Sequence, residues 1–313
     1  MEGKGAGPGW LIAAILALVA PTAAAGAEPG CVIQQVAEIP ARLTQAGQLM
    51  IAVTMNGQPE EMLLDTGAPV SFVSDALVNA LDLPVRPTGA RTGGIDGSFD
   101  VRLARVAELR AGNAPSRNQD FLVMPTKAGR PAPAGLFGAD YLRSYDVELD
   151  PAEGKVKLFS PGHCPNGGVY WDKAWYELPF RLADDLHIRL PVSVDGTTVR
   201  AVLDTGSPQT AIRLRVAERR LGVLRDQVKA GYIGPVSGTR GHGVDAYRHR
   251  FALIDLGGIQ LKNWEVNLLD DAGGSAGWNG DEMLIGMDVL GRFRMMIDYG
   301  QSKIFFTQQP DQK

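Results

Sequence analysis

Residues 63–73 read LLDTGAPVSFV, and residues 202–212 read VLDTGSPQTAI, so the chain carries the tripeptide Asp-Thr-Gly twice, each time behind an apolar run. On average amino-acid usage, a single Asp-Thr-Gly occurs by accident in roughly one chain in ten to twenty of this length. Two copies in matching surroundings are far less expected by accident. The pair therefore indicates that a unit containing this tripeptide has been duplicated.

The repeat is larger than the tripeptide. Sliding the sequence by 139 residues aligns residues 37–69 with residues 176–208 without a gap. Each copy then continues with a helical pattern, a glycine-rich stretch and further strand-like runs. Each copy next reaches an apolar pair followed by Gly, one residue and Asp, LFGADYL at 136–142 and LIGMDVL at 284–290. Such self-similarity over the whole chain predicts a tandem duplication.

Strand signals dominate both copies. The alternating runs MIAVTM and IRLPVSV end in Asn56-Gly57 and Asp195-Gly196, pairs that favour tight β-hairpins. A Pro- and Gly-rich stretch separates the copies and reads as a linker. We therefore expect an all-β protein with two homologous β-barrel lobes related by a pseudo-twofold axis. The predicted units are an N-terminal lobe at 32–160, a linker at 161–172 and a C-terminal lobe at 173–308.

Composition and motifs exclude several classes of function. The 313 residues are 45% apolar, the net charge is −4, and no dense Lys/Arg cluster offers a surface for nucleic acid. The four histidines are scattered without an HExxH pair, and no nucleotide-binding glycine motif occurs, so we expect neither a metal nor a cofactor. Residues 273–277 fit the G-x-S-x-G pattern of serine hydrolases, but they lack the preceding apolar strand and following helix that this motif needs.

The N-terminus indicates export. A lysine precedes an apolar run of about eleven residues from Trp10 to Ala20, short of the roughly twenty that span a membrane. Small residues follow, so we interpret residues 1–27 as a cleaved signal peptide and expect a secreted or periplasmic protein without stable membrane insertion. An uncleaved anchor is the alternative. In an oxidising compartment Cys31 and Cys164, the only cysteines, can form a disulfide, although two unrelated thiols remain possible.

The two aspartates offer a mechanism. Hydrolysis of an amide needs a group that activates water and a group that protonates the leaving nitrogen, and two adjacent carboxylates can do both. Asp65 and Asp204, one from each lobe, would meet at the axis and share one proton, because two like charges so close do not both ionise easily.

The neighbours of the aspartates fit the same arrangement. We expect Thr66 and Thr205 to form hydrogen bonds across the axis. Gly67 and Gly206 would occupy turns where a Cβ would crowd the facing lobe. Ser207 follows the second motif where the first has an alanine, and its hydroxyl could donate to Asp204, so we predict that Asp65 holds the shared proton more of the time.

With these motifs, the sequence resembles the aspartic proteases, in the form of two retropepsin-like units in one chain. The resemblance covers about residues 36–306 and implies an active-site cleft between the lobes, with Asp65 and Asp204 catalytic. The aspartate pair of that family is the established example of two carboxyl groups that share one proton. The stretch RTGGIDGSFDVR is similar to the family's glycine-rich flap, and an ordinary glycine turn is the alternative. The flap candidates are Gly93, Gly94, Ile95, Asp96 and Gly97. A counterpart is expected within residues 231–243.

The expected function is therefore that of an aspartic endopeptidase that acts on protein or peptide substrates. One chain supplies both halves of the site, so a monomer suffices. The alternative is the same bilobal scaffold used as a non-catalytic binding or inhibitor-like module. Both aspartates are present, which argues against a decayed site.

Overall fold

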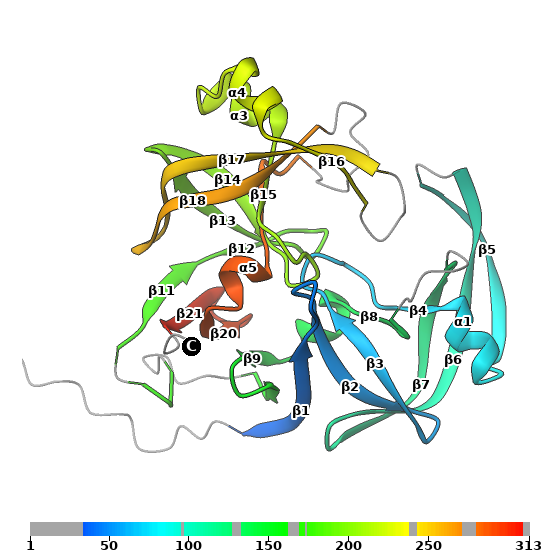
Figure 1. Ribbon diagram of the computed structural model, residues 1–313. Helices are drawn as coiled ribbons and strands as arrows, with labels where there is room; N and C mark the ends of the chain where they lie inside the picture. The colour runs from blue at the N-terminus through cyan, green and yellow to red at the C-terminus, as the bar shows by residue number, and fades with distance from the viewer. Residues whose placement is uncertain are drawn as a thin grey trace, which may run out of the picture.

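The structure is a computed structural model that describes residues 34–94, 97–126, 133–161, 169–172, 174–237, 243–270 and 280–308. Several predicted features lie outside these ranges: the signal peptide at 1–27, both cysteines of the expected disulfide (Cys31 and Cys164), the flap residues Ile95 and Asp96, and the G-x-S-x-G stretch at 273–277. Within the described ranges the chain is mostly β, with a few short helices (Figure 1).

The first half forms a barrel that closes on itself, because β2, β3, β8, β4, β7 and β6 pair in this order and β6 pairs back with β2. These strands are β2 (Leu49–Met55), β3 (Gln58–Leu64), β4 (Phe72–Ser74), β6 (Gly97–Ala111), β7 (Ala114–Met124) and β8 (Gly135–Phe137). Strand β5 (Val85–Gly94) pairs with β6 alone and forms an edge. Two short helices accompany the barrel, α1 (Asp75–Ala80) and α2 (Ala139–Leu142).

The second half repeats this barrel, with β13, β14, β19, β15, β18 and β17 in order and β17 paired back with β13. Its strands are β13 (Ile188–Val194), β14 (Thr197–Leu203), β15 (Ala211–Arg213), β17 (Gly243–Leu256), β18 (Ile259–Leu269) and β19 (Met283–Ile285). The edge strand is β16 (Tyr232–Ser237), and the helices are α3 (Leu214–Arg220), α4 (Arg225–Ala230) and α5 (Met287–Leu290). The predicted duplication and the two-barrel fold are therefore confirmed.

The expected hairpins explain why strands begin and end at equivalent places in the two barrels. Asn56 and Gly57 have φ values of 48° and 82°, and Asp195 and Gly196 have φ values of 45° and 82°. Two successive residues with positive φ form the type I′ turn that joins strands with the right-handed twist, and Asn-Gly and Asp-Gly adopt it most readily. The same turn thus sets the register of β2–β3 and of β13–β14.

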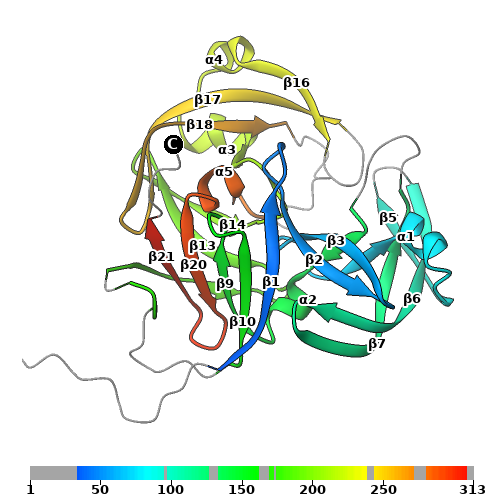
Figure 2. The same cartoon turned by 60° about the horizontal axis from the view of Figure 1, so that its bottom comes forward.

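A third sheet joins the halves. Its strands are, in order, β11 (Tyr176–Pro179), β21 (Lys303–Gln308), β20 (Phe293–Asp298), β9 (Asp146–Asp150), β10 (Lys155–Phe159) and β1 (Gln35–Leu43). Figure 2 shows the red strands of the second half beside the green and blue strands of the first. The short strand β12 (Arg181–Leu182) leads from this sheet into the second barrel. Each half therefore contributes three strands to one shared layer.

The centre of this layer marks the pseudo-twofold axis. Strands β20 and β9 are antiparallel, and Met296 faces Glu148, its own equivalent in the other half. Glu148 is fully buried, so its charge needs a partner. Arg294 of the second half donates to the Glu148 carboxylate at 2.7 Å, and the Tyr170 hydroxyl donates to it at 2.6 Å. This ion pair links the halves at the axis.

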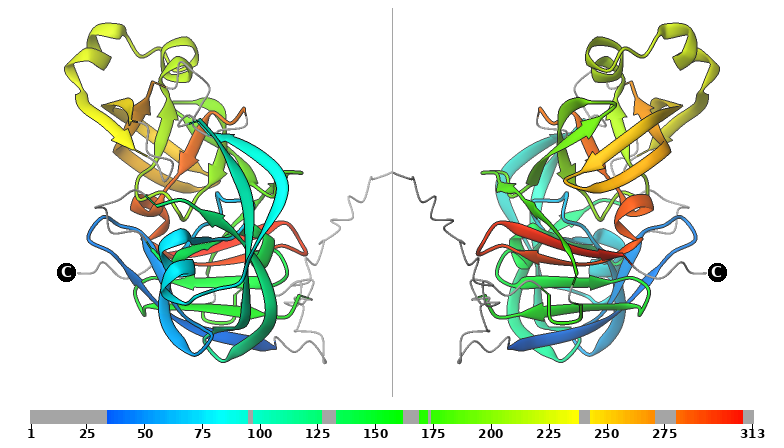
Figure 3. Two further views of the ribbon diagram at one scale, coloured as in Figure 1. Left: turned by 90° about the vertical axis from the view of Figure 1, so that its right-hand side faces the viewer. Right: turned by 90° about the vertical axis from the view of Figure 1, so that its left-hand side faces the viewer.

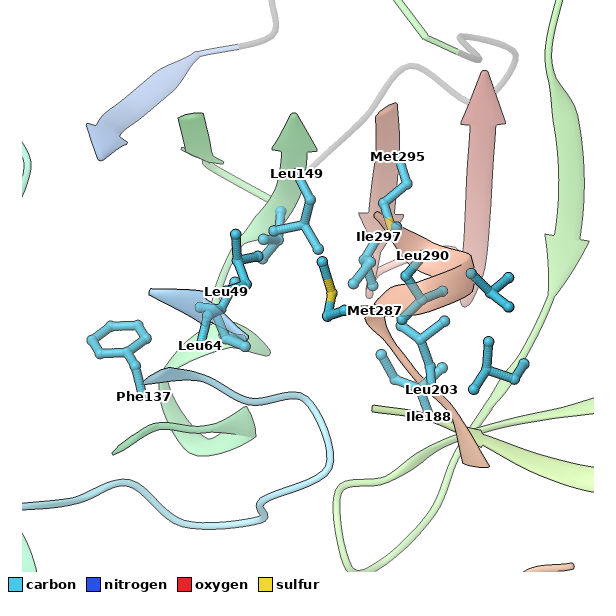
Figure 4. Packing of buried hydrophobic residues seen from close by; sticks show 14 of the residues in the cluster. Leu49, Leu64, Phe137, Leu149, Ile188, Leu203, Met287, Leu290, Met295 and Ile297 are labelled. Atoms are coloured by element: carbon cyan, nitrogen blue, oxygen red, sulfur yellow. The ribbon is translucent and has the colours of Figure 1, made fainter. Parts of the chain in front are cut away.

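One apolar core runs through both halves. Figure 4 shows Met287 of α5 between Leu149 and Leu49 of the first half and Leu290 of the second. Met287 is 4% exposed and Leu149 and Leu290 are fully buried. The lobes are therefore packed against each other as one hydrophobic unit, which fixes their relative position. In the described part of the chain, no helix is long and apolar enough to cross a membrane.

Replacing Leu149 by alanine tests this shared core. The side chain is fully buried on β9 beside the central strand pair, so Leu149→Ala should lower the free energy of unfolding by about 2–5 kcal/mol. Leu224, which is 65% exposed, is the matched control, and Leu224→Ala should change it by about 0.5 kcal/mol or less. Urea unfolding measures both. Equal effects would show that the lobes do not depend on the shared core.

Candidate active site

Both catalytic candidates lie one residue beyond the end of a barrel strand. Strands β3 and β14 end at Leu64 and Leu203, where each pairs in parallel with the LFG or LIG strand of its own half. The amide of Asp65 donates to the Phe137 carbonyl at 3.0 Å, and the amide of Asp204 donates to the Ile285 carbonyl at 3.0 Å. The predicted apolar-apolar-Gly elements therefore hold the two aspartates at equivalent positions in the two halves.

The two threonines connect the lobes as predicted. The Thr66 hydroxyl donates to the Leu203 carbonyl at 2.7 Å and accepts from the Thr205 amide at 3.1 Å. The Thr205 hydroxyl donates to the Leu64 carbonyl at 2.9 Å and accepts from the Thr66 amide at 3.0 Å. Both residues are buried. Four hydrogen bonds thus hold the loops of the two Asp-Thr-Gly motifs against each other.

The two glycines are required by close approach between the lobes. A Cβ on Gly67 would lie 2.6 Å from Cγ of Asp204, and a Cβ on Gly206 would lie 2.2 Å from Cγ of Asp65. Real Cβ atoms do not tolerate such distances, so any side chain at either position would push the opposite carboxylate away. The predicted crowding is confirmed, and it shows that each carboxylate packs against the opposite loop.

The two carboxylates lie close enough to change each other's pKa, and their surroundings differ. Burial raises the pKa of Asp65 well above its ordinary value, and the negative charge of Asp204 raises it further. Burial also raises the pKa of Asp204, but the amides of Ser207 and Gly206 each donate to its Oδ1 at 3.0 Å and oppose this rise. Amides also oppose the rise at Asp65, where Gly67 donates to Oδ1 at 2.8 Å, so backbone donors stabilise the anion at both carboxyls.

The role predicted for the Ser207 hydroxyl is wrong. This hydroxyl donates to the Gln209 carbonyl at 2.8 Å, and it is the backbone amide of Ser207 that donates to Asp204. The hydroxyl forms its hydrogen bond within its own turn, and the carboxylate accepts from the backbone amide instead. The proton assignment to Asp65 stays a prediction.

A second layer of polar residues was missed from the sequence. Asp140 accepts from the hydroxyl of Ser71 at 2.6 Å, and Asp288 accepts from the hydroxyl of Thr210 at 2.7 Å. Each of these hydroxyls in turn accepts from the glycine amide of the LFG or LIG element. The Asp that follows each element in the sequence was the available signal. These residues brace the segments behind the catalytic loops.

His187 is the other residue that motif analysis missed. It lies just before β13 in the second lobe, it is 5% exposed, and its Nε2 lies 2.7 Å from the Gly67 carbonyl oxygen of the first lobe. The sequence showed only a solitary histidine. Its role depends on the contact between lobes, and no local pattern reports that contact.

The predicted flap segment is a hairpin of β5 and β6, in which Gly93 pairs with Ser98 and Gly94 with Gly97. The hairpin extends from the first barrel in the direction of the second lobe (Figures 1 and 3). Its counterpart is the β16–β17 hairpin, in the stretch expected from the repeat. The hairpins are present in both halves, and their contact with substrate stays a prediction.

Comparison with known proteins agrees with this geometry. A model of the aspartyl protease family matches residues 51–141 and 190–289, one match in each half. The chain belongs to the aspartyl protease family. The crystal structure of basic 7S globulin from soybean is similar in fold, with a TM-score of 0.50, 11% sequence identity and coverage of 89% of this chain and 97% of that chain. No curated protein matches the sequence.

Membership in the aspartyl protease family is consistent with a site built from carboxylates alone. Within the ranges that the structure describes, no three histidine, cysteine or acidic side chains are grouped to hold a metal ion. The two aspartates within these ranges offer an acid and a base at one place.

The raised pKa of Asp65 predicts a stability effect that is independent of activity. Above about pH 4 an unfolded Asp65 ionises while the folded one keeps its proton, so the unfolded state binds fewer protons and stability falls as the pH rises. Asp65→Asn, which cannot ionise, should therefore be more stable than the wild type at pH 7, with the difference vanishing near pH 3. Denaturant unfolding across pH measures this. The exposed Asp184→Asn should show no such trend.

Removing one threonine hydroxyl tests whether the crossed hydrogen bonds hold together the two loops of this member of the aspartyl protease family. Thr205→Val keeps the shape but leaves the Leu64 carbonyl and the Thr66 amide without partners, at about 1–3 kcal/mol for each buried group. Thr198→Val, at an exposed position of β14, is the matched control. Thermal and urea unfolding should show a loss only for Thr205→Val. Equal stability of the two variants would contradict the claim that these hydrogen bonds stabilise the contact between the lobes.

Proposed function

We propose that this protein is an aspartic endopeptidase that hydrolyses peptide bonds with a water activated by Asp65 and Asp204. The observation that carries the proposal is the close pair of carboxylates, each packed against the opposite loop and each supplied by an equivalent loop of one lobe. A pair that shares one proton provides a base and an acid at the same place. Few other arrangements of two aspartates at a lobe seam offer both at once.

The proposal gives the two carboxylates different roles. Asp204, stabilised as an anion by two amides, takes a proton from water as the hydroxide oxygen attacks the scissile carbonyl carbon. Asp65 donates its proton to the carbonyl oxygen. Collapse of the tetrahedral intermediate then moves a proton to the leaving nitrogen and restores the pair. The overall reaction adds one water across the C–N bond.

The supporting residues have roles in the same proposal. Thr66 and Thr205 hold the loops coplanar through their crossed hydrogen bonds, and Gly67 and Gly206 leave room for the opposite carboxylates. We further propose that the β5–β6 hairpin closes over a bound peptide. The substrate is then a protein or peptide, and the enzyme works outside the cytoplasm as a monomer after loss of residues 1–27.

Cleavage assays test the proposal directly. The purified protein is incubated with denatured casein and with a peptide library at about pH 3 to about pH 8, with and without a statine-type transition-state mimic. Wild type should cleave and the mimic should inhibit it. Asp65→Asn should lose at least about 100-fold in rate, because it removes the acid of the pair. Asp184→Asn, an exposed matched change, should cleave as wild type does.

The alternative is a non-catalytic bilobal binding scaffold. If neither casein nor any library peptide is cut at any pH, or if Asp65→Asn cuts as well as the wild type, the endopeptidase proposal fails. Saturable binding of library peptides without cleavage would then favour the scaffold.

A further inference from the structure

His187 connects the second lobe to the catalytic loop of the first. Its Nε2 lies 2.7 Å from the carbonyl oxygen of Gly67, and the imidazole is 5% exposed. A carbonyl oxygen only accepts hydrogen bonds, so Nε2 must carry the hydrogen. The contact thus fixes one nitrogen of the ring as a donor.

The peptide group that His187 contacts leads to the dyad. The carbonyl of Gly67 and the amide of Ala68 belong to the same peptide group, and the Ala68 amide, which donates to the Asp65 backbone carbonyl at 3.4 Å, lowers the pKa of the Asp65 carboxyl. The Gly67 amide also donates to Asp65 Oδ1, at 2.8 Å. Hydrogen bonds in such a chain polarise one another. A donor at the Gly67 carbonyl therefore strengthens the donor aimed at Asp65.

The other ring nitrogen faces a carboxylate. Nδ1 lies 3.2 Å from Asp185 Oδ2, at ion-pair distance but without the alignment of a hydrogen bond, and it is buried. Asp185 is held by two hydrogen bonds from Arg189, at 3.0 and 2.8 Å. Arg189 also donates twice to the buried Asp281, which Arg200 approaches at 3.2 Å. The carboxylate that faces Nδ1 is therefore itself held in place by Arg189.

This arrangement exists in one half only. By the 139-residue repeat, the equivalents of Leu186, His187 and Arg189 in the first half are Gly47, Gln48 and Met50. Leu186 has a φ of 63°, in the left-handed region that Gly47 occupies with a φ of 83°. A leucine there is strained, and such strain persists only where the surroundings impose it. The turn that presents His187 is therefore held in place by its contacts.

We propose that His187 is a positioning residue of the aspartate pair, which orients the first catalytic loop through Gly67 and, as an imidazolium, stabilises the single negative charge of the pair. The catalytic consequence rests on the proposed function, whereas the charge coupling does not. The charged groups around the ring are Asp185 of its own turn, Arg189 of β13 beyond it, and the two aspartates of the facing loops. A positive charge on His187 lowers the pKa of Asp204, in the direction that this role requires.

The pH profile of cleavage separates this role from a structural one. His187→Gln keeps an amide that can donate to the Gly67 carbonyl but removes the charge. The anionic pair then loses a stabilising charge, so the acidic limb of kcat/KM should move to higher pH by about one unit, with the maximum retained within about threefold. The matched control is His249→Gln, because His249 packs on Phe251 in the second barrel and should leave the limb unchanged. His187→Leu should also lower kcat itself, by about 10-fold or more.

A second measurement needs no activity. In protein with ¹⁵N-labelled histidine, the ring signal of His187 is assigned by its loss in His187→Gln. Coupling between two sites is reciprocal, so Asp204→Asn should move the ring titration of His187 to lower pH by as much as His187→Gln moves the limb. If His187→Gln does not fold, Asp185→Asn, which removes the facing carboxylate, should shift the limb in the same direction.

The outcomes distinguish the two proposals. If wild type cleaves nothing, the proposed function fails, and the ring titration alone decides the coupling. A limb that does not move in His187→Gln, or a His187 ring that is insensitive to Asp204→Asn, would overturn the role of His187 even in an active protease.

Discussion

The crossed hydrogen bonds of Thr66 and Thr205 are the constraint on which the site depends. Each hydroxyl donates to a strand-end carbonyl of the opposite lobe and accepts from the opposite amide, so neither loop can complete its hydrogen bonding alone. Buried backbone groups without partners are costly. The lobes must therefore meet at one distance and one rotation, and this same geometry brings two acidic groups together.

The rest of the fold keeps the lobes in that position. The shared six-strand sheet pairs β9 with β20 at the axis, and the core runs through it from Leu149 to Met287. An arrangement with two separate cores would allow the barrels to rotate against each other. Because carboxylates repel when both ionise, a loose seam would let them separate. The continuous core opposes this separation and keeps the two carboxylates close together.

Much of this architecture could be predicted from the sequence because the duplication supplied two independent observations of each element. The hairpins at Asn56-Gly57 and Asp195-Gly196 and the strand ends before Asp65 and Asp204 rest on local patterns. The crowding at Gly67 and Gly206 followed from the symmetry alone.

The remaining features depend on contacts that have no local pattern. Ser207 was expected to act through its hydroxyl, but a competing carbonyl two residues away takes that hydroxyl, which only the turn geometry decides. His187 is a lone histidine in the sequence, and its partner Gly67 is 120 residues away in the other half.

Joining two units in one chain has a physical consequence beyond stability. In a symmetric dimer every residue near the axis occurs twice, so a charge placed beside one aspartate also lies beside the other. Here Glu148 faces Met296, Ala68 corresponds to Ser207, and Gln48 corresponds to His187, all without symmetric partners. The duplicated core preserves the geometry while residues around the axis diverge. Two carboxylates at equivalent positions can then have different surroundings within one chain.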